Sequence, residues 1–118
     1  SNKLWTELLG ILLIDFSKWT EKHFKRSREI QLEFEKYYPR NLVRAKIDNL
    51  KKDILEIKDQ INNQKKPLEK YLLLTYGVLD KWTIQVDSND LEQIKRIALD
   101  FKKMGFDQTY IIESNRSK

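Results

Sequence analysis

The apolar residues between positions 43 and 61 recur at alternating intervals of four and three. They are Val43, Ile47, Leu50, Ile54, Ile57 and Ile61. This heptad spacing predicts a helix over about residues 41–64 with one narrow apolar stripe, the 43–61 stripe. Because such a stripe is unfavourable in water, we expect it to be buried against another helix of the same chain or of a second copy.

Three basic residues, Arg44, Lys51 and Lys58, lie beside the stripe at one heptad position. Antiparallel pairing of two identical helices would bring these like charges together, whereas parallel pairing brings Asp53 near Lys58. Parallel self-pairing, or pairing with the first helix, is therefore favoured, and the stripe is a predicted self-association seam. The alternative is that it forms the inner face of an intramolecular hairpin.

The segment before this helix also has helical spacing. Residues 3–38 contain no proline and one glycine, and their apolar positions predict one long helix. Pro39 disfavours helical backbone at Tyr38, so a bend is expected there. A connection this short favours an antiparallel helical hairpin, with one continuous kinked rod as the alternative.

After Pro67 the pattern changes from helical spacing to strands. Residues 71–76 and 82–86 are rich in aromatic and branched side chains around the turn-prone segment 77–80, which predicts a strand hairpin. An open edge of this small sheet would invite pairing with a second copy unless another element covers it.

A third helix is predicted over about residues 89–104. Asn89 is its expected N-cap, with Glu92 three residues later, and Gly105 occupies the position that favours a left-handed residue. A final strand is expected over about 108–113. The polar tail 114–118 has nothing to bury and is predicted to be disordered.

These elements predict an α+β protein. Residues 1–66 are expected to form a long N-terminal helical hairpin or kinked coiled coil, packed on a small C-terminal β-β-α-β unit of residues 67–118.

Composition restricts the classes of protein. The 118 residues include 40% hydrophobic and 35% charged residues and no cysteine, so we expect an ordered, soluble chain without thiolate metal sites or cysteine nucleophiles. The most apolar run, residues 8–14, is too short to span a bilayer and lacks a cleavage site after it. We therefore expect a cytoplasmic protein without a membrane partner.

The positive charge is concentrated in the helical half. Residues 1–66 contain 15 Lys or Arg and 10 Asp or Glu, so they carry the whole net charge of +5. Eight of the cations are candidate contacts to a protein partner or to phosphates. They are Lys22, Lys25, Arg26, Arg28, Arg40, Arg44, Lys51 and Lys52. Acidic residues are interspersed, so the alternative is a solvated helix with intrahelical ion pairs.

Candidate chemistry is sparse. The aromatic residues Trp5, Phe16 and Trp19, with Phe24, are a possible interface, and packing over the C-terminal sheet is the alternative. His23 has no second histidine or cysteine and is expected to be structural. Residues 87–90 look like part of a calcium loop, but helix capping explains them. We find no motif of a catalytic site, so neither enzymatic activity nor a cofactor is expected.

The stretch from Trp82 to Ile112, WTIQVDSNDLEQIKRIALDFKKMGFDQTYII, resembles one half of a SPOR repeat, the strand-helix-strand unit of bacterial peptidoglycan-binding domains. The matching features are the 84–86 strand, the amphipathic helix with Ile97 and Phe101, the Gly105-Phe106 stop and Tyr110. The resemblance covers about a quarter of the chain and lacks the second repeat. It implies a strand-helix-strand fold, and no binding residue is transferred from it.

The predicted function is therefore assembly. We expect a non-enzymatic interaction protein that forms a homodimer through its helices and presents a basic helical surface to a larger protein complex. The alternative is a nucleic-acid-binding accessory protein of a bacterium, plasmid or phage, in which residues 22–52 follow the phosphate backbone.

Overall fold

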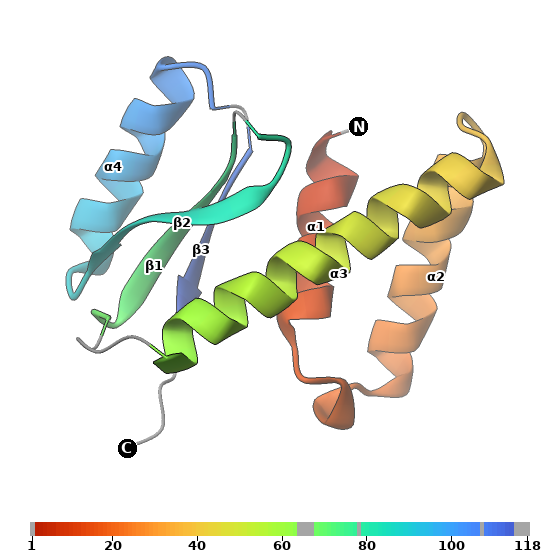
Figure 1. Cartoon of the computed structure of the whole chain (residues 1–118), viewed down its shortest axis with the longest axis horizontal. Helices are drawn as coiled ribbons and strands as arrows, with labels where there is room; N and C mark the ends of the chain where they lie inside the picture. Colours follow the sequence, from red (N-terminus) through yellow and green to blue (C-terminus); the bar gives the residue numbers. More distant parts are fainter. Residues whose placement is uncertain (1, 64–67, 78, 107, 115–118) are drawn as a thin grey trace. The chain divides into compact units, whose positions relative to one another are not determined.

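A computed structural model describes residues 2–63, 68–77, 79–106 and 108–114 (Figure 1). The chain has an α+β fold with four α-helices and a three-stranded antiparallel sheet among these residues. Helices come first and a β-β-α-β sequence follows, which confirms the predicted order. The chain divides into two compact units, residues 1–54 and 55–118. The boundary predicted between residues 66 and 67 lies within residues 64–67, outside the described residues.

The prediction of one helix over residues 3–38 is wrong. The chain forms α1 (Asn2–Leu13), the 3-10 turn η1 (Phe16–Lys18) and α2 (Glu21–Glu35). Two local hydrogen bonds explain the break. In each, a side chain accepts a hydrogen bond from a backbone amide that would donate to a backbone carbonyl if the helix were continuous. The Asp15 carboxylate accepts from the Ser17 amide, and His23 Nδ1 accepts from the Thr20 amide at 3.0 Å. His23 is thus a structural residue at the start of α2.

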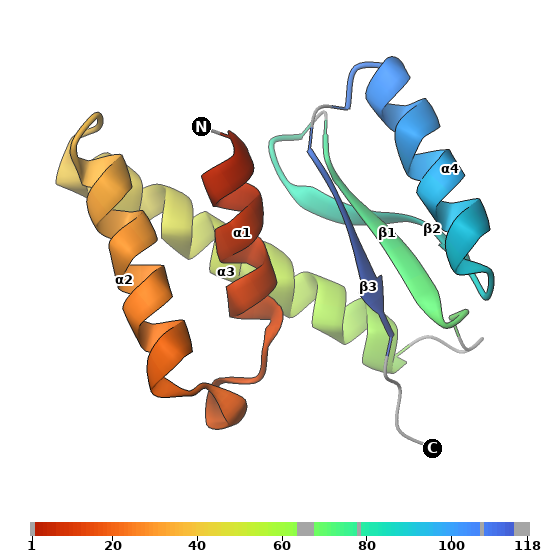
Figure 2. The ribbon, with the colours of Figure 1, turned by 180° about the vertical axis from the view of Figure 1, so that it is seen from behind.

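Helices α1 and α2 run antiparallel and contact each other (Figure 2). Trp5, near the start of α1, stacks on Phe34, near the end of α2, with ring centroids 3.9 Å apart and an interplanar angle of 12°. Phe34 is buried. The helical hairpin of this unit therefore forms between α1 and α2, and not between two helices of residues 3–38 and 41–64 as predicted.

The bend predicted at Pro39 is confirmed, and a continuous rod through it is excluded. Helix α2 ends at Glu35, and the amides of Tyr37 and Tyr38 both donate to the Phe34 carbonyl at 3.0 Å. The Pro39 carbonyl then accepts from the amide of Val43 at 3.1 Å as the next helix starts. Since proline has no amide to donate, it suits this first turn.

The second long helix is confirmed as α3 (Arg40–Asn63). Of the 43–61 stripe, only Ile47 is half-buried, and the other residues are 9% exposed or less. The basic neighbours Arg44 and Lys51 are exposed. The stripe is thus buried within a single chain, so its burial does not require a second copy.

The sheet consists of β1 (Tyr71–Tyr76), β2 (Trp82–Ser88) and β3 (Thr109–Glu113) in the order β2-β1-β3. Strand β1 pairs antiparallel with both neighbours, so β2 and β3 run parallel to each other on either side of it. The β1–β2 turn contains Asp80 at φ 55°, whose amide donates to the Gly77 carbonyl. The predicted strand hairpin and final strand are confirmed.

Helix α4 (Leu91–Lys103) connects β2 to β3 and packs on one face of the sheet (Figure 1). Its buried residues Ile94 and Ala98 form a core with Leu73 of β1. The partly buried residues around this core are Tyr71, Val86, Leu91, Ile97, Phe101 and Ile111. Because side chains alternate along β1, Leu72 and Leu74 lie on the other face, where both are fully buried. Both faces of the central strand are therefore apolar.

The ends of α4 are set by Asp90 and Gly105. The predicted N-cap, Asn89, is wrong: the Asp90 carboxylate accepts from the amides of Glu92 and Gln93. Asn89 instead accepts from the Lys70 amide at 2.9 Å. Gly105 has a φ of 105°, which confirms the predicted left-handed stop. Of the predicted disordered tail, only Ser114 lies within the described residues, and its amide donates to the Lys70 carbonyl.

The last turns of α3 belong to the same unit as the sheet. Ile57 and Ile61 are buried there, and Lys81 Nζ after the β1–β2 turn is 2.9 Å from a Glu56 carboxylate oxygen. This ion pair joins α3 to the start of β2.

Candidate functional site

The helical unit has two adjoining hollows at the α2–α3 turn. One has a volume of about 430 Å³ and the other about 80 Å³, and Tyr38 lines both. The larger one is also lined by Leu4, Glu33, Phe34 and Tyr37, and the smaller by Trp5, Leu42, Val43 and Lys46. We name the larger one the turn hollow.

The turn hollow is surrounded by exposed apolar side chains. Tyr37 is 74% exposed, and Tyr38 and Leu42 are each about half exposed. Nearby charged groups already have partners, since Glu33 pairs with Lys36 at 3.3 Å and Lys46 Nζ lies 5.5 Å from the centre of the Trp5 ring. The region is therefore suited to apolar contact, with aromatic anchors of the kind that protein interfaces use.

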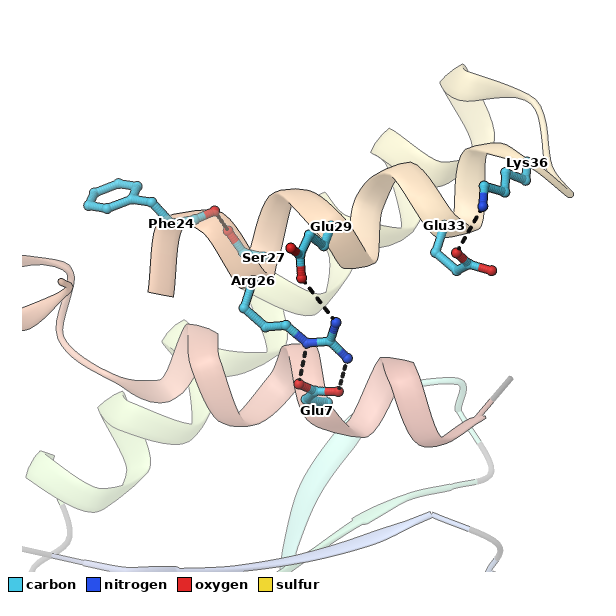
Figure 3. Close-up of polar contacts among 7 residues, drawn as sticks. All are labelled: Glu7, Phe24, Arg26, Ser27, Glu29, Glu33 and Lys36. Atoms are coloured by element: carbon cyan, nitrogen blue, oxygen red, sulfur yellow. Dashed lines mark hydrogen bonds and ion pairs between the residues drawn. The ribbon is translucent and has the colours of Figure 1, made fainter. Parts of the chain in front are cut away.

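A second exposed group of rings, the aromatic corner, joins α1 to α2. It consists of Phe16, Trp19 and Phe24, whose ring centroids lie 5.0 to 5.4 Å apart. The Trp19 indole N–H donates to the Ile14 carbonyl at 3.1 Å, so the indole has its hydrogen bond within the chain. In Figure 3 the Phe24 side chain points away from α1.

The structure separates the three aromatic residues predicted as one interface. Phe16 and Trp19 lie together in the aromatic corner, whereas Trp5 stacks on Phe34 and lines the smaller hollow. Sequence reasoning missed Tyr37 and Tyr38 as surface anchors. The available signal was the pair of tyrosines directly before Pro39. Two adjacent side chains at a turn point in different directions, so both rings cannot be buried in the same core.

Among the predicted cationic contacts, Arg26 is engaged within the helical unit (Figure 3). Its guanidinium binds both oxygens of Glu7 on α1, at 2.6 and 2.8 Å, and a Glu29 oxygen at 3.2 Å. The hydrogen bond from Arg26 holds the pKa of Glu7 below its usual range, and the same contacts raise the pKa of Arg26. A bidentate pair of this kind fixes α1 against α2 and leaves Arg26 little capacity for phosphate.

The other predicted cations are less engaged. Arg40 lies 3.7 Å from a Glu35 oxygen. Within residues 2–63 and the other described ranges, the remaining six are exposed and form no ion pair. They are Lys22, Lys25, Arg28, Arg44, Lys51 and Lys52. The first three lie on α2 with Phe24, beside the aromatic corner.

No group of three or more histidine and carboxylate side chains in the described part of the chain is placed to hold a metal ion. Among the described helices, none combines the length and the apolar character that a membrane crossing requires. Comparisons of the chain with protein-family models, curated proteins and solved structures find no match. A function for this chain therefore has to be argued from its surfaces.

Proposed function

We propose that this chain is a non-enzymatic assembly protein whose helical unit self-associates and presents a basic surface to a larger complex. The turn hollow is the observation that carries this proposal. It combines a volume of about 430 Å³ with a rim in which Tyr37 is 74% exposed. Exposed apolar patches often mark protein–protein contacts, and two adjacent exposed aromatic rings beside a hollow fit such a contact.

A second copy is the occupant that this surface suits. Two-fold interfaces bring the same patch of two chains together, so the patch must contain both a projecting group and a place to receive it. Tyr37 projects directly beside the hollow that it lines, and Tyr38 extends the rim towards Leu42. In a symmetric pair, each chain would insert its Tyr37 ring into the hollow of the other.

This contact differs from the one predicted from the heptad pattern. The 43–61 stripe is already buried within one chain apart from the half-buried Ile47, so a coiled-coil dimer through it would require the chain to open. The exposed rings at the α2–α3 turn require no rearrangement. Self-association at the turn therefore has the lower free-energy cost.

Sedimentation equilibrium over a wide range of protein concentration tests the proposal. We expect the wild-type average mass to rise from 14.3 kDa towards twice that value. The double variant Tyr37→Ser/Tyr38→Ser should remain monomeric, because it removes both anchors from an exposed position. Leu99→Ser is the matched control, since Leu99 is 58% exposed on α4, and it should associate like the wild type.

Two results would contradict the proposal. One is a wild-type mass that stays at the monomer value at every concentration. The other is association that the double variant retains in full while circular dichroism shows it to be folded. In the second case, the Ile54→Asp variant tests whether the chains associate through the 43–61 stripe instead.

A further inference from the structure

The aromatic corner lies in a basic segment of the helical unit. Residues 15–28 contain five Lys or Arg and two Asp or Glu, a net charge of +3 with His23 neutral. Arg26 is used by Glu7 and Glu29, but Lys22, Lys25 and Arg28 form no ion pair among the described residues. The corner therefore offers free positive charge beside aromatic rings.

The rings of the aromatic corner stay partly exposed after packing against one another. Phe16 is 68% exposed and Phe24 is 47% exposed, although both contact Trp19. Phe16 and Phe24 meet at an interplanar angle of 85°, an edge-to-face contact that covers at most one face of one ring. Part of the surface of both rings therefore stays exposed and can contact a ligand.

One cation follows Phe24 along α2. Arg28 is four residues after Phe24, so it lies one turn further along the same side of the helix. Lys25 and Lys22 are exposed on the adjoining face of the helix, about 100° and about 160° around its axis from Phe24. Rings that stack with bases, next to cations that bind the backbone, are the two components of single-strand nucleic-acid sites.

We infer that the aromatic corner binds single-stranded nucleic acid, with bases stacking on Phe16 and Phe24 and phosphates bound by Lys22, Lys25 and Arg28. A single strand is required because the bases of a duplex are already stacked on one another. This inference rests on the proposed function and specifies which class of ligand its basic surface binds. It does not involve the turn hollow.

An anionic membrane surface is the competing ligand for rings next to lysines. Asp15 and Glu21 lie in the same segment and are exposed. A flexible strand can adjust its path to contact the cations and avoid these exposed carboxylates, whereas a flat layer of lipid phosphates cannot. Charge complementarity therefore favours the strand.

Fluorescence anisotropy with a labelled oligothymidylate of about 15 nucleotides tests the inference in the full chain. With about three phosphates neutralised, the affinity should fall roughly 20-fold between 50 and 200 mM salt. A duplex of the same length should bind more weakly than the single strand, because the rings cannot stack on its bases.

Phe16→Leu separates stacking from apolar burial. Leucine keeps an apolar side chain at an exposed position, so the fold and any insertion into lipid should be retained. It has no aromatic face, so affinity for the oligonucleotide should fall by about tenfold. Lys22→Gln/Lys25→Gln should weaken binding and lower the salt slope by about 1.4, whereas the control Lys102→Gln/Lys103→Gln near the end of α4 should leave it unchanged.

Three outcomes would overturn the inference: no binding at 50 mM salt, equal binding of Phe16→Leu and the wild type, or a duplex bound as tightly as the single strand. Binding to phosphatidylserine vesicles that Phe16→Leu retains, without oligonucleotide binding, would assign the corner to lipid. The Tyr37→Ser/Tyr38→Ser variant should bind the oligonucleotide normally as a monomer. Loss of self-association and loss of nucleic-acid binding are thereby distinguishable.

Discussion

The two units of this chain differ in how many of their aromatic side chains they leave exposed. In the helical unit, Phe16, Phe24, Tyr37 and Tyr38 are each about half exposed or more. In the unit of residues 55–118, every described aromatic side chain is buried or half-buried. These are Tyr71, Tyr76, Trp82, Phe101, Phe106 and Tyr110. The unit of residues 55–118 uses its described rings for packing, whereas the helical unit buries Phe34 but leaves four other rings largely on its surface.

This difference indicates where binding and where stability are located. A ring in a core contributes its burial to folding, so its exposure in water would be costly. A ring that stays exposed contributes little to folding and is available to a partner. We therefore assign the binding surfaces to the helical unit. Substitutions of exposed and buried side chains can test this division.

The largest expected effect is in the core under α4. Leu73→Ala removes a fully buried side chain that packs on Ile94 and Ala98, so it should lower the free energy of unfolding by about 3 kcal/mol. Urea denaturation followed by circular dichroism measures this. Leu99→Ala, on the exposed side of α4, should cost less than about 0.5 kcal/mol. Equal losses in the two variants would contradict the burial on which the comparison depends.

A matched pair of phenylalanines tests the division directly. Phe101 packs against the α4 core and meets Phe106 edge to face at 5.3 Å, so Phe101→Ala should cost about 2 kcal/mol. Phe16→Ala removes a ring that is 68% exposed and should cost less than about 1 kcal/mol. If Phe16→Ala proves as costly as Phe101→Ala, the aromatic corner is a structural cluster rather than a binding surface.

A gain in stability is expected at Thr75 in β1. Its side-chain oxygen is buried and has no hydrogen-bond partner among the described residues. Valine has nearly the same shape without the hydroxyl, so Thr75→Val should raise the free energy of unfolding by about 1 kcal/mol. Thr83→Val, at the half-buried partner position on β2, is the control and should change stability less. A loss of stability in Thr75→Val would mean that the hydroxyl is satisfied in solution.

The smallest effect concerns the ion pair between α1 and α2. Because Arg26 lowers the pKa of Glu7 in the folded chain, the pair stabilises the fold above the unfolded-state pKa of about 4.3. That contribution is lost as the pH falls through the folded-state pKa. Glu7→Gln should therefore be slightly less stable than the wild type at pH 7, and this difference should shrink as the pH falls towards 3.

Exposure limits the size of this effect. The two side chains are 42% and 41% exposed, so solvent screens the pair and added salt should weaken it. Thermal unfolding of both proteins at the two pH values measures the difference. The control Glu113→Gln removes a carboxylate without an ion pair among the described residues and should show no such pH dependence. A Glu7→Gln difference that is as large at pH 3 as at pH 7 would exclude this electrostatic origin.

Regular spacing made several elements predictable. The 43–61 stripe predicted α3 to within about one residue, and the change of pattern after Pro67 predicted β1, β2 and β3. Gly105 was identified as the end of α4 because a left-handed residue is needed there. Each of these features depends on neighbours a few positions apart.

The wrong predictions concern segments in which several local signals compete to set where a helix begins or ends. Helical spacing continued across residues 14–20, but the side chains of Asp15 and His23 bond nearby amides and stop the helix. Asn89 and Asp90 are both good capping residues, and the position of Lys70 on a distant segment decided between them. Local propensity alone could not resolve either case.

From the sequence by itself came α3, α4 and the three strands, the apolar face of α3 and the concentration of positive charge in the first half, because these depend on residue spacing and composition. Only the tertiary structure decided that α1 folds back on α2, that Arg26 is bound by Glu7, and that Tyr37 and Tyr38 border a hollow. The physical reason is that spacing defines which side chains share a face. Which faces meet depends on contacts between residues far apart in the chain, and small side-chain hydrogen bonds at the turns select among them.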